Sequence, residues 1–151
     1  TLAVLDRSLT ELREFLLERP SLSLALNIGS QDLHDSRFAE ALDSGLRAAG
    51  VPPATYKLEL TERALVNADL ARRAIADFRA RGHSVAVDDF GTGYSSLAYL
   101  AGFSVDQLKI DKTFVEAIGT GAATSHVVVH VIEMAQSLKL RMVAEGVELS
   151  M

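Results

Sequence analysis

The chain contains no cysteine in its 151 residues. This absence excludes disulfide bonds and thiolate metal ligands, and it fits a protein of the reducing cytoplasm or the cytoplasmic part of a membrane-anchored parent. No apolar run approaches the ~18 residues that a membrane-spanning helix needs, so we expect no direct membrane insertion. A phosphate-binding glycine loop of the Walker type is also missing, which argues against an unrelated magnesium-dependent phosphotransferase.

Basic residues are in the minority. Lysine and arginine number 15 against 20 aspartates and glutamates, which gives a net charge of −5. A general nucleic-acid binder normally presents a basic surface, so we do not expect that class of function. If the ligand is an anionic nucleotide, metal ions must supply much of the positive charge around it.

Short strand-like segments alternate with helical patterns five times along the chain. Leu5, Leu9, Leu12 and Leu16, for example, have the spacing of an amphipathic helix. The patterns predict strands over 21–28, 56–61, 84–90, 107–112 and 141–147, and helices over 2–19, 36–49, 67–81, 94–102 and 125–139. This alternation favours βα units with parallel strands in one α/β domain.

The segment 85–97, VAVDDFGTGYSSL, ends an apolar run in two adjacent carboxylates, Asp88 and Asp89. Such a pair is stable mainly where a cation or strong hydrogen bonds offset the repulsion, which suggests a metal site. Gly91 and Gly93 allow the backbone to turn tightly after it. Because Asp and Gly are also ordinary turn residues, a solvated acidic turn is an equal alternative from this segment alone.

Each predicted strand carries a polar residue toward its carboxyl end: Asn27, Glu59, Asp88, Lys109 and Glu145. Side chains alternate between the faces of a strand, so these residues face away from the aliphatics that pack on the helices. In a parallel barrel, this end of the strands carries the active site. A single residue of this kind is most often a satisfied structural group, but five in register indicate one shared site.

The oxygen ligands at this edge are hard ones. Asn27, Glu59 and Asp88 suit Mg²⁺ or Mn²⁺ better than zinc, and Asp89 and Glu145 could join Asp88 in holding a second ion. Two ions about 3.5–4 Å apart can clamp a phosphodiester and activate a water for in-line attack.

Three further residues have alternative roles. Lys109 would orient the water or offset charge on the phosphorane. Alternatively, it would form a structural ion pair that holds the carboxylates apart. Glu62 would accept hydrogen bonds from the loop 91–93, or it would be an ordinary acid before a helix. Asp111 would support Lys109 or cap the end of its strand.

The segments LNIGSQDL, LELTE, VAVDDFGTGYSSL, LKIDKTFV and VAEGVE occur in this order. They resemble the EAL family of bacterial cyclic di-GMP phosphodiesterases, and the resemblance runs through nearly the whole chain. It implies a TIM-barrel-like (β/α) fold and metal-dependent hydrolysis of cyclic di-GMP to the linear dinucleotide pGpG in second-messenger signalling.

The resemblance also implies residue roles. Metal-binding positions map onto Asn27, Glu59, Asp88, Asp89 and Glu145, and the catalytic group comprises Lys109 with Glu145 and Asp89. Glu62 maps onto the glutamate that orders the loop after Asp89. That loop resembles the family's dimerisation region, which implies a homodimer formed through Gly91, Thr92, Gly93, Tyr94, Ser95 and Leu97.

The sequence departs from the family at both ends. The Glu-Ala-Leu signature of the first strand and the family's downstream glutamine are absent, and a full barrel needs about 200 residues or more. We therefore expect residues 1–151 to form an incomplete EAL domain of about five βα units, with regulatory domains in a longer parent and weak or no hydrolysis by this chain alone. The alternative is a catalytically inactive cyclic di-GMP sensor or dimerisation scaffold.

Overall fold

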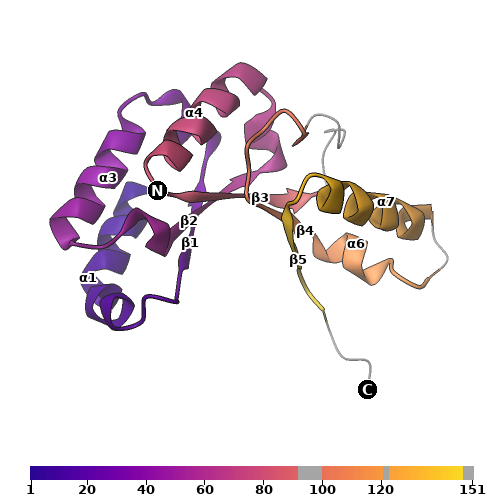
Figure 1. Ribbon diagram of the computed structural model, residues 1–151, viewed down its shortest axis with the longest axis horizontal. Helices are drawn as coiled ribbons and strands as arrows, with labels where there is room; N and C mark the ends of the chain where they lie inside the picture. Colours follow the sequence, from indigo (N-terminus) through magenta and orange to yellow (C-terminus); the bar gives the residue numbers. More distant parts are fainter. Residues whose placement is uncertain (92–99, 121–122, 148–151) are drawn as a thin grey trace.

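The computed structural model describes residues 1–91, 100–120 and 123–147 (Figure 1). Its strands are β1 (Leu24–Ile28), β2 (Tyr56–Thr61), β3 (Ser84–Phe90), β4 (Gln107–Ile110) and β5 (Arg141–Ala144). All neighbouring strands pair in parallel, in the order β1-β2-β3-β4-β5. The predicted α/β fold with five parallel strands is therefore confirmed.

Helices follow or precede each strand. They are α1 (Leu2–Glu18), α2 (Ser30–His34), α3 (Phe38–Ala49), α4 (Ala68–Ala80), α6 (Lys112–Glu116) and α7 (Ala123–Ser137), with short 3₁₀ turns at η1 (Pro53–Thr55) and η2 (Glu62–Leu65). The Asn67 side chain caps α4 by accepting a hydrogen bond from the Leu70 amide. Among the described helices, none is both long and apolar enough to cross a bilayer.

The core lies between the sheet and these helices. Figure 1 shows α1, α3 and α4 gathered around β1 to β3, whereas α6 and α7 lie at the β4–β5 end. Leu58 and Leu108 of the strands are fully buried, as are Leu5 of α1 and Leu42 of α3. The alternating aliphatic positions of the strands thus anchor the sheet to the helical layer, which leaves their polar neighbours on the opposite face.

Three strand boundaries differ from the prediction. The strand predicted over 107–112 is wrong in its last two residues, because the Asp111 side chain accepts a hydrogen bond from the Thr113 amide and starts α6 instead. β1 begins at Leu24 rather than at residue 21, and β5 ends at Ala144, one residue before Glu145. Most of the helix predicted over 94–102 lies outside the described residues.

Asp106 joins several elements at the amino-terminal edge of the sheet. Its Oδ2 accepts a hydrogen bond from the buried Val85 amide at 2.9 Å, and its own amide donates to the Val85 carbonyl at 2.8 Å. Its carbonyl accepts from the Arg141 amide, and its Oδ1 pairs with Arg79 of α4. The side chain and backbone of this one residue therefore connect α4 with the starts of β3, β4 and β5.

We expect Asp106→Ala to lower the free energy of unfolding by about 1–3 kcal/mol, because the buried Val85 N–H loses its side-chain acceptor. Asp106→Asn, which keeps an acceptor oxygen, should cost less. The control is Asp69→Ala, which removes an ion pair whose carboxylate is 84% exposed and should change stability by less than about 0.5 kcal/mol. Urea unfolding followed by circular dichroism measures all three, and equal midpoints for Asp106→Ala and Asp69→Ala would contradict the assignment.

Candidate functional site

Lys109 lies at the centre of a group of carboxylates at the carboxyl edge of the sheet. Its Nζ is 2.9 Å from Glu59 Oε2 on β2, 2.9 Å from Asp88 Oδ1 on β3 and 2.8 Å from Glu145 Oε1 after β5. The Lys109 side chain is only 13% exposed. The structure therefore brings four of the five predicted polar residues into one cluster, and each comes from a different strand or strand end.

The surroundings of Lys109 fix its charge. Burial alone would lower the pKa of its ammonium group, but the hydrogen bonds to Glu145, Glu59 and Asp88 outweigh burial and raise the pKa far above its ordinary value. Lys109 is thus a positively charged hydrogen-bond donor at neutral pH. It can stabilise negative charge, but it cannot take a proton from water in this state.

Asp88 and Asp89 both reach the cluster because β3 is irregular there. Consecutive side chains of a regular strand face opposite sides. The register between β3 and β4 shifts between Val87 and Phe90, and Asp89 has φ = 52°, in the left-handed region that Asp tolerates better than most residues. The Asp89 amide also donates to Asp88 Oδ1 at 2.9 Å. This bulge sets the local direction of the two adjacent carboxylates.

The donor set fits a hard divalent cation. Asp88, Asp89 and Glu145 each offer an oxygen atom, and these atoms lie within 4.8 Å of one another. Burial raises the pKa of the Asp89 carboxyl, and the negative charges of Asp88, Asp111 and Glu145 raise it further, whereas Lys109 lowers it. The negative charge around Asp89 thus outweighs the ammonium, and all-oxygen ligands of this kind suit Mg²⁺ or Mn²⁺.

Glu62 connects η2 with the turn after β3. It is buried, and its Oε2 accepts a hydrogen bond from the Gly91 amide at 3.2 Å. This is a contact of the kind that the sequence predicts for Glu62, although its role in ordering the whole loop stays a prediction. Of the expected dimerisation residues the structure describes Gly91; Thr92, Gly93, Tyr94, Ser95 and Leu97 lie outside the described residues.

Asn27 and Asp111 lie beside the cluster. Asn27 of β1 is exposed and is the parallel partner of Glu59, which places it on the strand next to the lysine-bound carboxylate. Asp111 caps α6, and its hydrogen bonds to the Thr113 hydroxyl and amide lower the pKa of its carboxyl. Asp111 therefore takes the strand-end role, while metal binding by Asn27 and support of Lys109 by Asp111 stay predictions.

Sequence reasoning missed two residues of α6, Lys112 and Phe114. Their side chains lie against Gly146 and Gly91, the glycines that follow Glu145 and the Asp88-Asp89 pair. The one signal in the sequence was that a glycine follows closely after each carboxylate, and the structure gives both glycines a positive φ. An aromatic residue in a short helical segment is otherwise indistinguishable from ordinary core.

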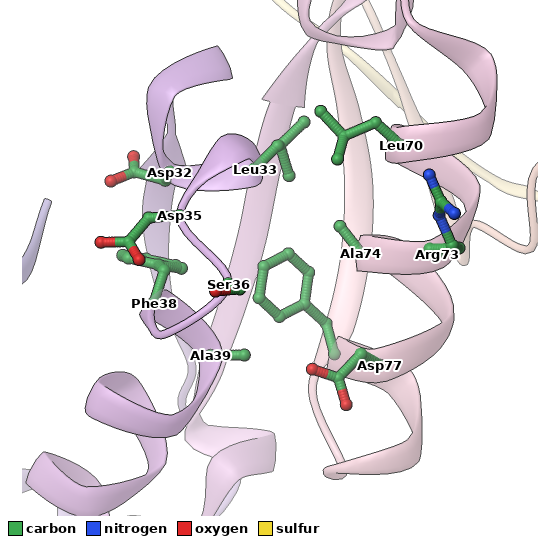
Figure 2. Close-up of a pocket in the computed structure, with 11 residues that line it drawn as sticks. Asp32, Leu33, Asp35, Ser36, Phe38, Ala39, Leu70, Arg73, Ala74 and Asp77 are labelled. Carbon is green, nitrogen blue, oxygen red and sulfur yellow. The ribbon is translucent and has the colours of Figure 1, made fainter.

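A separate hollow of about 240 Å³ lies in the helical layer, between α2 and α3 on one side and α4 on the other (Figure 2). Leu33, Phe38 and Leu70 give it an apolar lining, and Asp35 and Arg73 add charge. None of the residues that line it belongs to the Lys109 cluster. Asp32, Asp35 and Asp77 also line it, but they do not form a close group of oxygens, as Asp88, Asp89 and Glu145 do. The cluster at the sheet edge is therefore the better candidate for metal-dependent chemistry.

Comparison with known proteins agrees with this fold. The family model of the EAL domain matches residues 1–150. The chain is 39% identical over 150 residues to the probable cyclic di-GMP phosphodiesterase PdeB of Escherichia coli, and 37% identical over 147 residues to the cyclic di-GMP phosphodiesterase NbdA of Pseudomonas aeruginosa. These matches cover 99% and 96% of this chain, but only 28% and 19% of the relatives' lengths.

Solved structures show the same likeness. The EAL domain of Mycobacterium smegmatis DcpA superposes with a TM-score of 0.86 at 33% identity, over 97% of this chain and 67% of that one. The phosphodiesterase PaMucR in complex with c-di-GMP gives a TM-score of 0.85 at 29% identity, over 97% of this chain and 64% of that one. With its parallel sheet and its sequence match over residues 1–150, this chain belongs to the EAL domain family.

Proposed function

We propose that this chain forms part of a cyclic di-GMP phosphodiesterase domain that hydrolyses cyclic di-GMP to pGpG with the help of two Mg²⁺ or Mn²⁺ ions. The observation that carries the proposal is the Lys109 ammonium held among carboxylates from β2, β3 and the end of β5. The relatives' names, which specify cyclic di-GMP phosphodiesterases, support this substrate. An inactive cyclic di-GMP sensor is the competing function.

The carboxylates of this chain would hold the metal ions. Asp88, Asp89 and Glu145 form the close oxygen group, and Glu59 and Asn27 occupy adjoining strands. When bound, the divalent ions would supply positive charge to the phosphate and lower the pKa of a nearby water.

The remaining steps fall to the protein side chains. Lys109 would donate a hydrogen bond to a phosphate oxygen or to the attacking water, and its fixed positive charge would stabilise the phosphorane as negative charge develops. Asp89, whose carboxylate lies close to those of Asp88 and Glu145, would act in catalysis together with Lys109 and Glu145, as the family resemblance implies.

Binding of cyclic di-GMP to the 151-residue chain should require both a divalent ion and Asp88. We expect calorimetry to give a binding isotherm with Mg²⁺ and none with EDTA, and Asp88→Asn to weaken binding at least about tenfold, because one carboxylate contributes more than ~1.4 kcal/mol to a desolvated cation site. The matched control is Asp35→Asn, an equal change of charge in the hollow of Figure 2, which should leave binding unchanged.

Two results would redirect the proposal. Equal binding with and without Mg²⁺ would favour the sensor over the phosphodiesterase. A loss of binding in Asp35→Asn but not in Asp88→Asn would move the nucleotide site to the helical layer.

Lys109→Met should change metal affinity and stability in opposite directions. Lys109 shares Asp88 and Glu145 with the metal-binding group, so removal of its charge should tighten Mn²⁺ binding about tenfold. A tenfold change in affinity corresponds to about 1.4 kcal/mol. This is less than the ~4 kcal/mol between two unit charges at 4 Å and an effective dielectric of 20, because Glu145 is 35% exposed and solvent screens the interaction. Without metal, the free energy of unfolding of the variant should be lower by about 2 kcal/mol, because the buried Glu59 carboxylate loses its charged partner.

Electron paramagnetic resonance titration measures the Mn²⁺ affinity, and urea unfolding with EDTA or with Mn²⁺ measures stability. Lys57→Met, which removes a positive charge two residues before Glu59 on β2, is the control. An unchanged Mn²⁺ affinity in Lys109→Met would show that the ammonium and the metal do not compete for these carboxylates.

We also propose a homodimer through the segment that begins at Gly91, from the family resemblance of residues 91–97. A charge in this segment, Leu97→Glu, should shift the chain toward monomer in sedimentation velocity, because an interface cannot bury an unpaired carboxylate cheaply. Leu17→Glu on the exposed part of α1 is the control and should leave the species unchanged. An identical sedimentation coefficient for both variants and the unmodified chain would remove the dimer role from this segment.

A further inference from the structure

The turns that carry the cluster's carboxylates both contain a glycine with a left-handed backbone. Gly91, two residues after Asp89, has φ = 102°, and Gly146, one residue after Glu145, has φ = 65°. L-residues with a side chain rarely adopt such angles, so glycine fits both turns. The two glycines also share a neighbour, the one-turn helix α6.

α6 touches both turns through side-chain carbon. A Cβ placed on Gly91 would lie 2.7 Å from Phe114 Cζ, and a Cβ placed on Gly146 would lie 2.6 Å from Lys112 Cγ. Each glycine is thus pressed directly against a side chain of α6, with no room for even a methyl group. Phe114 is itself partly buried and packed on the main core.

α6 is in turn fixed to the strand that carries the lysine. It starts immediately after β4, and the Asp111 side chain caps it through the Thr113 amide and hydroxyl. The Glu145 amide donates to the Ile110 carbonyl at 3.1 Å, which ties the second turn to the same strand end. Lys109 and the two carboxylate turns are therefore all connected to the end of β4 and the helix α6 that follows it.

We propose that Phe114, assisted by the aliphatic stem of Lys112, is a positioning residue that sets the separation between the Asp88-Asp89 pair and Glu145. The Phe114 ring supports the Gly91 turn from one side, while Glu62 holds the Gly91 amide from another. The contact between Phe114 and Gly91 stands on the geometry alone, and its consequence for metal binding rests on the proposed function.

Loss of the ring would free the turn. A truncated side chain leaves a void beneath Gly91 that the backbone can enter, and the hydrogen bond to Glu62 loosens as it does so. Divalent ions require oxygen ligands at about 2.0–2.6 Å, so a small shift of the Asp88-Asp89 pair relative to Glu145 weakens the site. Lys109 is on β4 and keeps its own backbone position.

The first test needs no metal. We expect Phe114→Ala to speed hydrogen exchange of the Gly91 amide at least about fivefold in EDTA, measured by NMR at a pH where the chain stays folded. Phe114→Leu, which fills part of the void, should give a smaller increase and serves if the alanine variant unfolds. Phe103→Ala is the matched control, because it removes a buried ring that lies beside Arg72 rather than Gly91. It should leave Gly91 exchange unchanged.

The second test measures coupling. Mn²⁺ affinity is determined for the wild type, Gly91→Ala, Phe114→Ala and the double variant. The left-handed strain that Gly91→Ala introduces is present with and without the ring, so it cancels from the cycle, whereas the clash with the ring does not. Gly91→Ala should reduce the Mn²⁺ affinity by some factor in the wild type. We expect that factor to be at least about three times smaller when Gly91→Ala is made in the Phe114→Ala background.

The Lys112 stem is tested in the same assay. Lys112→Met keeps the carbon that touches Gly146 and should retain Mn²⁺ affinity, whereas Lys112→Ala removes that carbon and should weaken binding about threefold or more. Equal affinities of the two variants would remove Lys112 from the proposal.

The outcomes distinguish this inference from the proposed function. Unchanged Gly91 exchange in Phe114→Ala, or an equal increase in Phe103→Ala, would overturn the positioning role, and so would additive effects of Gly91→Ala and Phe114→Ala. Failure of the unmodified chain to bind Mn²⁺ would count against the proposed function alone, and the exchange measurements would still decide the role of Phe114.

Discussion

The candidate site depends on one ammonium group held among carboxylates. Glu59 is only 8% exposed, and a carboxylate so deeply buried is tolerated only with a charged partner. Lys109 supplies that partner and also pairs with Asp88 and Glu145. These contacts require β2, β3 and β4 to be adjacent and parallel, with Glu145 leaving β5 at the same edge, so the strand order and the site are two aspects of one constraint.

The two edges of the sheet have different tasks. At the amino-terminal edge, Asp106 satisfies backbone donors and pairs with Arg79, and these polar contacts hold elements together. At the carboxyl edge, the carboxylates outnumber the ammonium, and Asp89 adopts a left-handed conformation. Polar groups that match their partners favour stability, whereas unbalanced charge and strained backbone favour ligand binding. This division is the one expected of parallel β/α sheets.

Much of the fold and part of the site could be predicted from the sequence. Alternating aliphatics located all five strands, and the polar residue on each strand indicated Glu59, Asp88, Lys109 and Glu145. Alternation could not show that a bulge sets the direction of Asp89, because bulges depend on pairing with β4. Nor could it end β4 at Ile110, where a side-chain cap prevails over strand propensity.

The role of α6 was beyond sequence reasoning for a different reason. The contact between Phe114 and Gly91 joins helix α6 to the turn after β3, and only the three-dimensional structure shows it. No spacing or periodicity along the chain distinguishes such a ring from an ordinary core residue.

The position of Lys109 has a consequence for metal binding. Its ammonium offsets part of the carboxylate repulsion and so helps to keep the oxygens of Asp88, Asp89 and Glu145 within 4.8 Å of one another. The same ammonium would compete with a bound ion for Asp88 and Glu145, so the metal affinity would be lower than for the carboxylates alone. Binding of an ion would therefore weaken the ion pairs of Lys109 with Asp88 and Glu145. The N–H donors of the Lys109 ammonium would then be available to an anionic ligand.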